Sequence, residues 1–257
     1  MTTELIFGMV GGLGLFLYGM QLLSDGLQKA TGDKIQRILE FLTNKPVMGV
    51  ATGALITSII QSSSATSVIT IGLVNAGLLS LKQAVSVIAG ANIGTTVTAQ
   101  IVSFRLEQYA LPAIGIGFII NFLAKRKSYK YFGQILLGFG ILFLGLYTMS
   151  HAVRPLRNYA PFLSLIANIS YNPLLGIAVA AIFTAIIQSS SATTAIVIAM
   201  SIQGIIGIEA AIPLILGSNI GTCFTAGIAS IGSSITGKRV ALSHLFFNIG
   251  GVVLFLF

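Results

Sequence analysis

Two short polar motifs each occur twice inside long apolar runs of this chain. Gln61-Ser62-Ser63-Ser64-Ala65-Thr66 returns as Gln188-Ser189-Ser190-Ser191-Ala192-Thr193, and Asn92-Ile93-Gly94-Thr95 returns as Asn219-Ile220-Gly221-Thr222. Their hydroxyl and amide groups can both donate and accept hydrogen bonds. Because such groups are costly to bury without partners, their repetition in apolar sequence indicates a binding site for a polar solute or an ion.

Both motifs belong to one internal duplication. Without any gap, residues 46–99 match residues 173–226 at 25 of 54 positions. Self-similarity at a fixed period marks a repeated structural unit. We therefore predict a first repeat at residues 1–130 and a second at residues 131–257.

The composition predicts an all-α integral membrane protein. Of the 257 residues, 55% are hydrophobic and only 8% are charged, whereas a soluble domain carries about 25% charged residues. Charge-free runs such as 46–81 and 158–208 are also too long for the core helices of a soluble fold. The apolar start of the chain has no basic flank, which predicts a first span and no removable signal.

The polar motifs divide two apolar segments into arms that are too short to cross a bilayer. About 14 residues precede Gln61, or about 21 Å of helix, against a hydrocarbon core of about 30 Å. We therefore expect a re-entrant helical hairpin in each repeat, at residues 46–81 and 173–208.

Full spans are expected on either side of the hairpins, with a surface connector from Ser24 to Lys45 and a second connector between residues 150 and 172. The starts of the two repeats are separated by three crossings, and this odd number gives the repeats inverted topology. The expected spans lie near residues 4–23, 83–104, 109–124, 131–150, 210–231 and 240–257.

The basic residues predict the orientation of these spans. Three of the 14 fall on one side: Arg105, Arg154 and Arg157. The other eleven fall on the opposite side: Lys29, Lys34, Arg37, Lys45, Lys82, Lys125, Arg126, Lys127, Lys130, Lys238 and Arg239. Because cytoplasmic loops carry an excess of Lys and Arg, the first hairpin should enter from the cytoplasm and the second from outside. This pattern favours membrane orientation over nucleic-acid binding as the reason for the net charge of +8.

An interrupted helix at the tip of each hairpin would suit an anion. Serine can cap the new helical arm, and the free N–H groups and positive end of that arm attract negative charge. Donors that converge from two tips suit a tetrahedral oxyanion, so phosphate fits better than a planar carboxylate.

Oxygen atoms of the same motifs suit a small, hard cation. All six acidic residues lie at predicted segment ends: Glu4, Asp25, Asp33, Glu40, Glu107 and Glu209. Without an intramembrane carboxylate for a proton relay, sodium is the expected coupling ion. Bound cations would also lower the cost of moving a divalent anion through a medium of low dielectric constant.

The paired motifs resemble those of the sodium-phosphate cotransporter family, which comprises the type II cotransporters of animals and their bacterial relatives. The resemblance covers residues 5–255, including Ala241-Leu242-Ser243-His244-Leu245-Phe246-Phe247-Asn248-Ile249-Gly250-Gly251. It implies a sodium-driven symporter of inorganic phosphate that works by alternating access. The short connector between the repeats is more similar to a bacterial member, so we expect a multi-pass protein of the bacterial cytoplasmic membrane.

The expected partners are inorganic phosphate, sodium and the lipid bilayer, and no nucleic acid is expected. A homodimer is left open. The resemblance also implies which residues bind phosphate and sodium. The phosphate-binding residues are predicted to be Gln61, Ser62, Ser63, Ser64, Asn92, Gln188, Ser189, Ser190, Ser191 and Asn219. The sodium-binding residues are predicted to be Gln61, Thr66, Asn92, Thr95, Gln188, Thr193, Thr194, Asn219 and Thr222.

Other functions remain open at this stage. An intramembrane serine hydrolase is disfavoured because the chain has no Gly-x-Ser-x-Gly elbow and no acid to orient a base, so we do not expect an enzyme. A carrier of sulfate or a dicarboxylate, a phosphate channel and a phosphate sensor could each use the same donor-rich site. The net direction of transport and the number of sodium ions are likewise left open.

Overall fold

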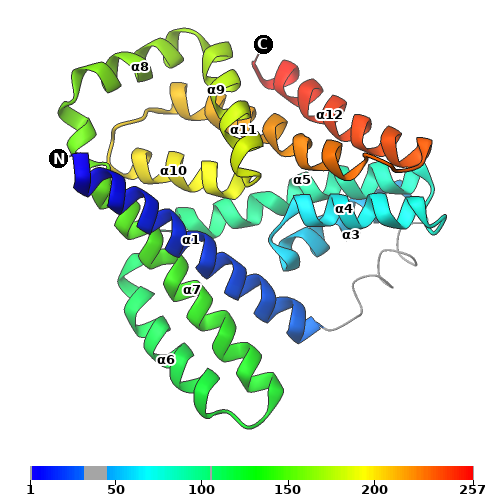
Figure 1. Ribbon diagram of the computed structural model, residues 1–257, viewed down its shortest axis with the longest axis horizontal. Helices are drawn as coiled ribbons and strands as arrows, with labels where there is room; N and C mark the ends of the chain where they lie inside the picture. The colour runs from blue at the N-terminus through cyan, green and yellow to red at the C-terminus, as the bar shows by residue number, and fades with distance from the viewer. Residues whose placement is uncertain (1, 32–44, 105, 257) are drawn as a thin grey trace. The chain divides into compact units, whose positions relative to one another are not determined.

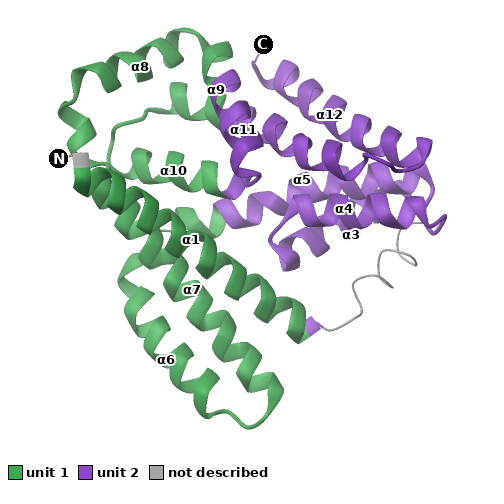
Figure 2. Cartoon of the chain, viewed as in Figure 1, with its two compact units in different colours: residues 1–30, 100–176, 192–214 green, residues 31–99, 177–191, 215–257 purple. Residues whose placement is uncertain are grey.

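The computed structural model describes residues 2–31, 45–104 and 106–256, and helices are the only regular secondary structure within them (Figure 1). The helices fall into two compact units (Figure 2). Unit 1 comprises residues 1–30, 100–176 and 192–214, and unit 2 comprises the remainder. Each unit thus takes segments from both halves of the chain, and the predicted division into repeats at 1–130 and 131–257 stays a prediction.

Unit 1 contains the helices that begin each half of the chain. Its elements are α1 (Thr2–Thr31), η1 (Glu107–Tyr109), α6 (Ala110–Leu123), α7 (Lys127–Ala152), η2 (Arg154–Asn158), α8 (Ala160–Tyr171) and most of α10 (Ser190–Ile202).

Unit 2 contains most of the duplicated segment. Its elements are α3 (Pro46–Ile60), α4 (Ser63–Asn75), most of α5 (Leu81–Ser103) and of α9 (Pro173–Ile187), the second half of α11 (Ile208–Ala229), and α12 (Ile235–Leu256).

The all-helical class and the presence of several spanning helices are confirmed. Within the described residues, α1, α5, α7, α11 and α12 are long and apolar enough to cross a membrane. The bent pair α8 and α9 would raise this number from five to six. The chain is therefore a multi-pass membrane protein by the length and composition of its helices.

Two of the remaining segments differ in detail from the expectation. The second connector, for which no helix was predicted, contains the 12-residue helix α8, and the chain bends by 112° from α8 into α9. The bend falls at Asn172, which has an extended φ of −125°, as expected for a residue before proline. Helix α6 has only 14 residues, about 21 Å, so its length alone does not span a bilayer.

The first connector, expected from Ser24 to Lys45, begins with helix, since α1 continues to Thr31. Its remainder, residues 32–44, lies outside the described residues, as does Arg105.

Helices α1 and α7 pack closely through glycines in unit 1. A Cβ atom added to Gly19 would lie 2.3 Å from the Leu142 backbone nitrogen, and one added to Gly138 would lie 2.7 Å from the Gly19 oxygen. Similarly, one added to Gly145 would lie 2.6 Å from the oxygen of Gly12. Because residue 12 faces residue 145 and residue 19 faces residue 138, the two helices run antiparallel. The contact is reciprocal: each helix contributes two glycines seven residues apart.

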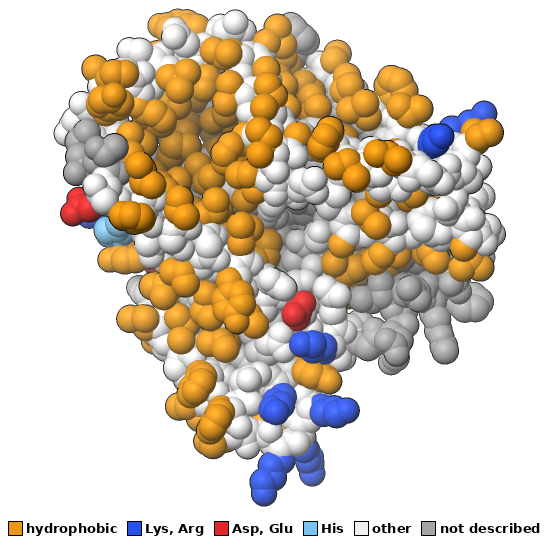
Figure 3. Space-filling model, in the orientation of Figure 1, with side chains coloured by type: hydrophobic (Ala, Val, Ile, Leu, Met, Phe, Trp, Pro, Cys, Tyr) orange, Lys and Arg blue, Asp and Glu red, His pale blue; other side chains and the backbone are white. Residues whose placement is uncertain are grey.

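The core of unit 1 forms around this helix pair. Phe16 of α1 and Phe143 and Leu146 of α7 are fully buried, together with Met149. Apolar side chains also remain exposed, and Phe122 of α6 is 74% exposed. In Figure 3, Lys and Arg side chains gather where α6 passes into α7, and hydrophobic side chains cover much of the visible helical surface. Such surfaces are compatible with lipid contact.

The close approach of α1 and α7 predicts a strong position dependence of glycine substitutions. Gly19→Ala should lower the thermal midpoint of the detergent-purified protein, because the added methyl group clashes with the α7 backbone; the cost should be about 1–3 kcal/mol. Gly14→Ala on the same helix should be neutral or stabilising, since its Cβ meets nothing within 4 Å. Equal midpoints for the two variants would contradict the packing.

Candidate functional site

Helix α3 packs against α5 through glycines in unit 2, and helix α9 packs against α11 in the same way. A Cβ atom on Gly90 would lie 2.0 Å from the oxygen of Val50. Forty residues separate this pair, as they separate Ile177 from Gly217, whose Cβ would lie 2.2 Å from the Ile177 oxygen. The duplication in sequence is therefore also a duplication of packing.

The glycines of the two Asn-Ile-Gly-Thr motifs continue this contact toward the Gln-Ser-Ser-Ser motifs. A Cβ on Gly94 would lie 2.5 Å from the Ala54 oxygen and 2.6 Å from Cβ of Thr57. In the second copy, a Cβ on Gly221 would lie 2.5 Å from the oxygen of Ala181 and 2.7 Å from Cβ of Thr184. Only glycine allows so close an approach, which explains its presence in both motifs.

The order of these contacts fixes the direction of the helices in the first copy. Gly49 at the start of α3 meets Ser86 near the start of α5, and Gly94 further along α5 meets Thr57 near the end of α3. Helices α3 and α5 therefore run parallel. Because α4 connects them, it returns the chain to the level at which α3 began.

A glutamine interrupts the helix in both copies. Among the described residues other than glycine, only Gln61 and Gln188 have a positive φ, at 58° and 56°. The backbone N–H of each glutamine donates a hydrogen bond to the threonine four residues earlier, from Gln61 N to Thr57 O and from Gln188 N to Thr184 O, both at 2.7 Å. A left-handed non-glycine residue costs about 1–3 kcal/mol and is often found at functional sites.

Ser62 starts the second arm of the first copy. It has extended backbone angles, and its hydroxyl accepts a hydrogen bond from the Ala65 backbone nitrogen at 3.1 Å. The predicted capping role of serine is thus confirmed at this tip. The backbone N–H groups of Ser63 and Ser64, in the first turn of α4, have no partner inside their own helix and are suited to bind an acceptor.

Hydrogen bonds of three threonines hold the first tip. Thr57 Oγ1 donates to Thr66 Oγ1 at 2.9 Å, which joins α3 to α4, and Thr66 Oγ1 donates to the Ser62 oxygen at 3.1 Å. Thr98 Oγ1 of α5 donates to Gln61 Oε1 at 2.7 Å, while Gln61 Nε2 donates to the Ser58 oxygen. The Gln61 side chain is buried, and its conformation is fixed by these bonds.

The second tip has the same backbone but a different side-chain arrangement. Gln188 is exposed, and Thr225, which occupies the position of Thr98, has a buried Oγ1 without a hydrogen-bond partner. The bond between Gln61 and Thr98 therefore lacks its counterpart between Gln188 and Thr225. The two copies share the same helix packing, but the glutamine and the threonine are hydrogen-bonded to each other only in the first copy.

The downstream motifs differ in a similar way. Thr95 and Thr222 make equivalent bonds to the preceding turn, to Ala91 O at 3.0 Å and to Ser218 O at 2.9 Å. Asn92 has a buried Nδ2 without a partner, whereas Asn219 is exposed. A buried, unpartnered amide donor in the first Asn-Ile-Gly-Thr motif is available for an acceptor such as an oxyanion.

The structure places most of the predicted site residues in unit 2. Both Gln-Ser-Ser-Ser segments and both Asn-Ile-Gly-Thr motifs belong to it, whereas Thr193 and Thr194 belong to unit 1. Direct bonds connect the first motif to Thr57 and Thr98, two threonines that were not among the predicted site residues. Both threonines recur in the second copy, as Thr184 and Thr225, and this recurrence could have indicated that they belong to the site. Convergence of the two tips on one point stays a prediction.

Cation binding at these motifs would depend on neutral oxygen ligands. Within the described ranges, no group of three or more His, Cys, Asp or Glu side chains is arranged to hold a metal ion. Hydroxyl, amide and carbonyl oxygens at the two helix breaks are the ligand types that a monovalent hard cation accepts.

Comparison with known proteins identifies the family. The model of the Na+/Pi-cotransporter family matches residues 15–151 and 158–257, and the chain belongs to this family. It is a family of transporters and not a class of enzymes.

Several curated relatives are similar over most of the chain. YqeW, an uncharacterized protein of Bacillus subtilis, is 35% identical over 94% of this chain and 78% of its own length. YjbB of Escherichia coli K12, provisionally named an inorganic phosphate export protein, is 26% identical over 96% of this chain. The chain spans less than half, 46%, of the length of YjbB.

An animal relative matches a shorter segment. Sodium-dependent phosphate transport protein 2A of Rattus norvegicus is 38% identical over 97 residues, which are 37% of this chain and 15% of that protein. No solved structure matches the chain.

Thr98 is hydrogen-bonded to Gln61, whereas the hydroxyl of the equivalent Thr225 has no partner. Replacing each threonine by valine should therefore change the stability by different amounts. Thr98→Val should lower the unfolding free energy by about 1 kcal/mol, because it removes the hydrogen bond to Gln61. Thr225→Val should be neutral or stabilising, because its buried hydroxyl has no partner to lose. Thermal unfolding in one detergent would compare them, and an equal loss in both variants would contradict the assigned asymmetry.

Proposed function

We propose that this chain is a sodium-coupled secondary transporter of inorganic phosphate that works by alternating access. The proposal rests above all on the duplicated helix break: in a chain of the Na+/Pi-cotransporter family, two copies of one polar motif share the same left-handed glutamine. The animal relative named for sodium-dependent phosphate transport and the relative named for phosphate export support phosphate as the solute. The ion gradients set the net direction of transport.

Phosphate would bind to the donors at the two tips. Backbone N–H groups of the first turns of α4 and α10, the hydroxyls of Ser62, Ser63 and Ser64, and those of their counterparts Ser189, Ser190 and Ser191 supply the donors. The unpartnered amide of Asn92 supports this role, and Asn219 and Gln188 would act from the second copy. These groups carry no formal charge, so bound cations must balance much of the charge of the anion.

Sodium would provide this balance. The proposed ligands are the oxygens of the two glutamines, the two asparagines, and the threonines 66, 95, 193, 194 and 222. Sodium coupling is favoured over proton coupling because the described acidic residues lie near helix ends: Glu4, Glu107 and Glu209 are in first turns, and Asp25 is in the last two turns of α1.

Inverted repeats with re-entrant hairpins at 46–81 and 173–208 would give this site two gates. The antiparallel, reciprocal contact between α1 and α7 supports an inverted relation, since these helices begin the two proposed repeats. The arms α3 and α4 have 15 and 13 residues, about 22 and 20 Å, which is short of a bilayer core of about 30 Å.

Alternating access requires the two copies to exchange states. The bond of Gln61 to Thr98 and the exposure of Gln188 supply two states of one motif in a single structure. Transport would exchange these states, so that each glutamine is held in turn while the other tip opens. The proposed membrane is the bacterial cytoplasmic membrane, and the excess of basic residues predicts that the α6–α7 loop lies on its cytoplasmic side.

The proposal predicts that both glutamines are needed. Gln61→Ala and Gln188→Ala should each reduce sodium-driven uptake of radiolabelled phosphate into proteoliposomes at least about tenfold, which corresponds to about 1.4 kcal/mol. Cys223→Ser is the matched control, because serine can keep the hydrogen bonds to His244 O and from Asn248. Full uptake by either glutamine variant would contradict a site shared by both tips.

The same vesicles separate the alternative functions. An inward sodium gradient should drive accumulation that an equal potassium gradient does not, and excess sulfate should leave it unchanged. Competition by sulfate would identify a carrier of a different anion. Flux that is indifferent to sodium would indicate a channel, and phosphate binding without flux would indicate a sensor.

A further inference from the structure

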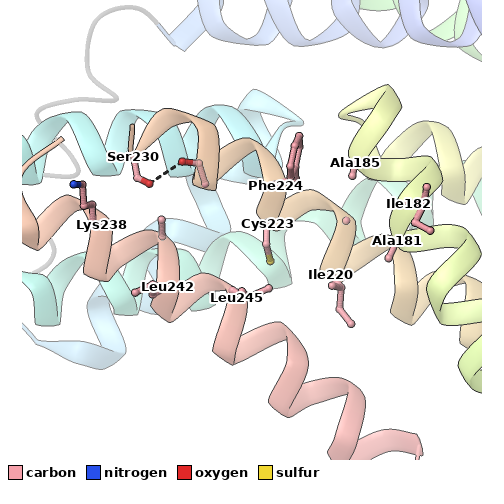
Figure 4. A pocket seen from close by; sticks show the side chains of 13 residues that line it. Ala181, Ile182, Ala185, Ile220, Cys223, Phe224, Ser230, Lys238, Leu242 and Leu245 are labelled. Atoms are coloured by element: carbon pink, nitrogen blue, oxygen red, sulfur yellow. Dashed lines mark hydrogen bonds between the residues drawn. The ribbon is translucent and has the colours of Figure 1, made fainter. Parts of the chain in front are cut away.

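An open apolar groove runs along unit 2, between α9, α11 and α12 (Figure 4). Its volume is about 610 Å³, within the range of about 300–1,000 Å³ typical of ligand sites. Ile182, Phe224 and Leu242 line it and are 63%, 54% and 52% exposed. These side chains are thus presented by three helices to one shared apolar space.

The groove is polar at only one end. Lys238, near the start of α12, is the only charged residue among those that line it. Ser230, close to the end of α11, also lines it, and its hydroxyl already donates to the oxygen of Gly227 at 2.7 Å. Ile220 lies ten residues before Ser230, about 15 Å along the helix. Polar and apolar lining are therefore separated along the groove.

We propose that this groove binds a membrane phospholipid with an anionic headgroup. One hydrocarbon chain would fill the apolar length of the groove, and the headgroup phosphate would pair with the Lys238 ammonium group. The groove is apolar along its length and has a single cationic side chain at one end. This arrangement matches the shape and the charge of such a phospholipid. Lys238 also lies on the side predicted to be cytoplasmic, where basic residues at helix ends attract anionic lipids.

The groove reaches the second copy of the duplicated motif. Ala181 and Ala185 of α9 and Gly221 of the second Asn-Ile-Gly-Thr motif line it, and Ala181 is in packing contact with Gly221. A bound acyl chain would therefore lie against α11 and against α9, which ends just before Gln188. The groove is lined by residues next to the proposed phosphate and sodium ligands Asn219 and Thr222, but lipid binding there does not depend on transport of phosphate.

Native mass spectrometry of the detergent-purified protein tests the headgroup. We expect the protein to retain phosphatidylglycerol in preference to phosphatidylcholine with the same acyl chains. Lys238→Gln should weaken phosphatidylglycerol binding about fivefold, with little change for phosphatidylcholine. Arg239→Gln is the matched control, because the neighbouring Arg239 does not line the groove. Equal retention of both lipids, or an equal effect of both substitutions, would overturn the proposed role of Lys238.

A second pair of variants tests the groove itself. Gly227 lines the groove, and a Cβ added there meets nothing within 4 Å, so Gly227→Leu should fold and fill the space. It should abolish retention of phosphatidylglycerol. Gly250→Leu on α12 is the control, since its Cβ is equally unobstructed and lies outside the groove. Unchanged lipid retention by Gly227→Leu, or no retention by the unmodified protein, would overturn the proposal.

Discussion

Interrupting a helix inside apolar sequence leaves backbone groups that must find partners, and the structure of unit 2 follows from this constraint. Each unsatisfied group costs several kcal/mol in a hydrocarbon environment. At the first tip, Gln61 turns the chain in a left-handed conformation, the Ser62 hydroxyl caps the new arm, and Thr57 bonds to Thr66 across the break. The remaining N–H groups in the first turn of α4 have no partner within their own helix. The interrupted helix therefore supplies the donors on which the proposed phosphate site rests.

Close helix packing holds these breaks in place. Gly94 and Gly221 each allow one helix to touch the backbone and threonine of another, in contacts that agree within a few tenths of an ångström between the copies. A rigid frame with two equivalent breaks can still hold them in different states. The bonded Gln61 and the exposed Gln188 are such a difference, and the proposed alternating access depends on it.

The sequence predicted the helices and the breaks because both depend on local chemistry. Apolar runs define α1, α5, α7, α11 and α12, and the Gln-Ser sequence defines the end of one arm and the cap of the next. The repeat offset also paired Gly94 with Gly221. Helix α8 was not predicted, because the residues before Asn172 were interpreted as a connector between two spans.

The states of individual side chains could not be predicted in the same way. Identical neighbours in sequence surround Gln61 and Gln188, yet only the first is buried and bonded to a threonine 37 residues further on. Such a difference depends on tertiary packing and not on the motif. The pairing of Thr98 with Gln61 likewise required knowledge of how α5 passes the break.

The proposed mechanism of alternating access is built on opposite orientation of the two repeats, and equivalent residues can report this orientation. Lys45 and Asn172 immediately precede α3 and α9, and both are exposed. On a Cys223→Ser background, Asn172→Cys should react with a membrane-impermeant maleimide on intact cells, and Lys45→Cys only after permeabilisation. Labelling of both residues from the same side would contradict inverted repeats and the two-gated transport that depends on them.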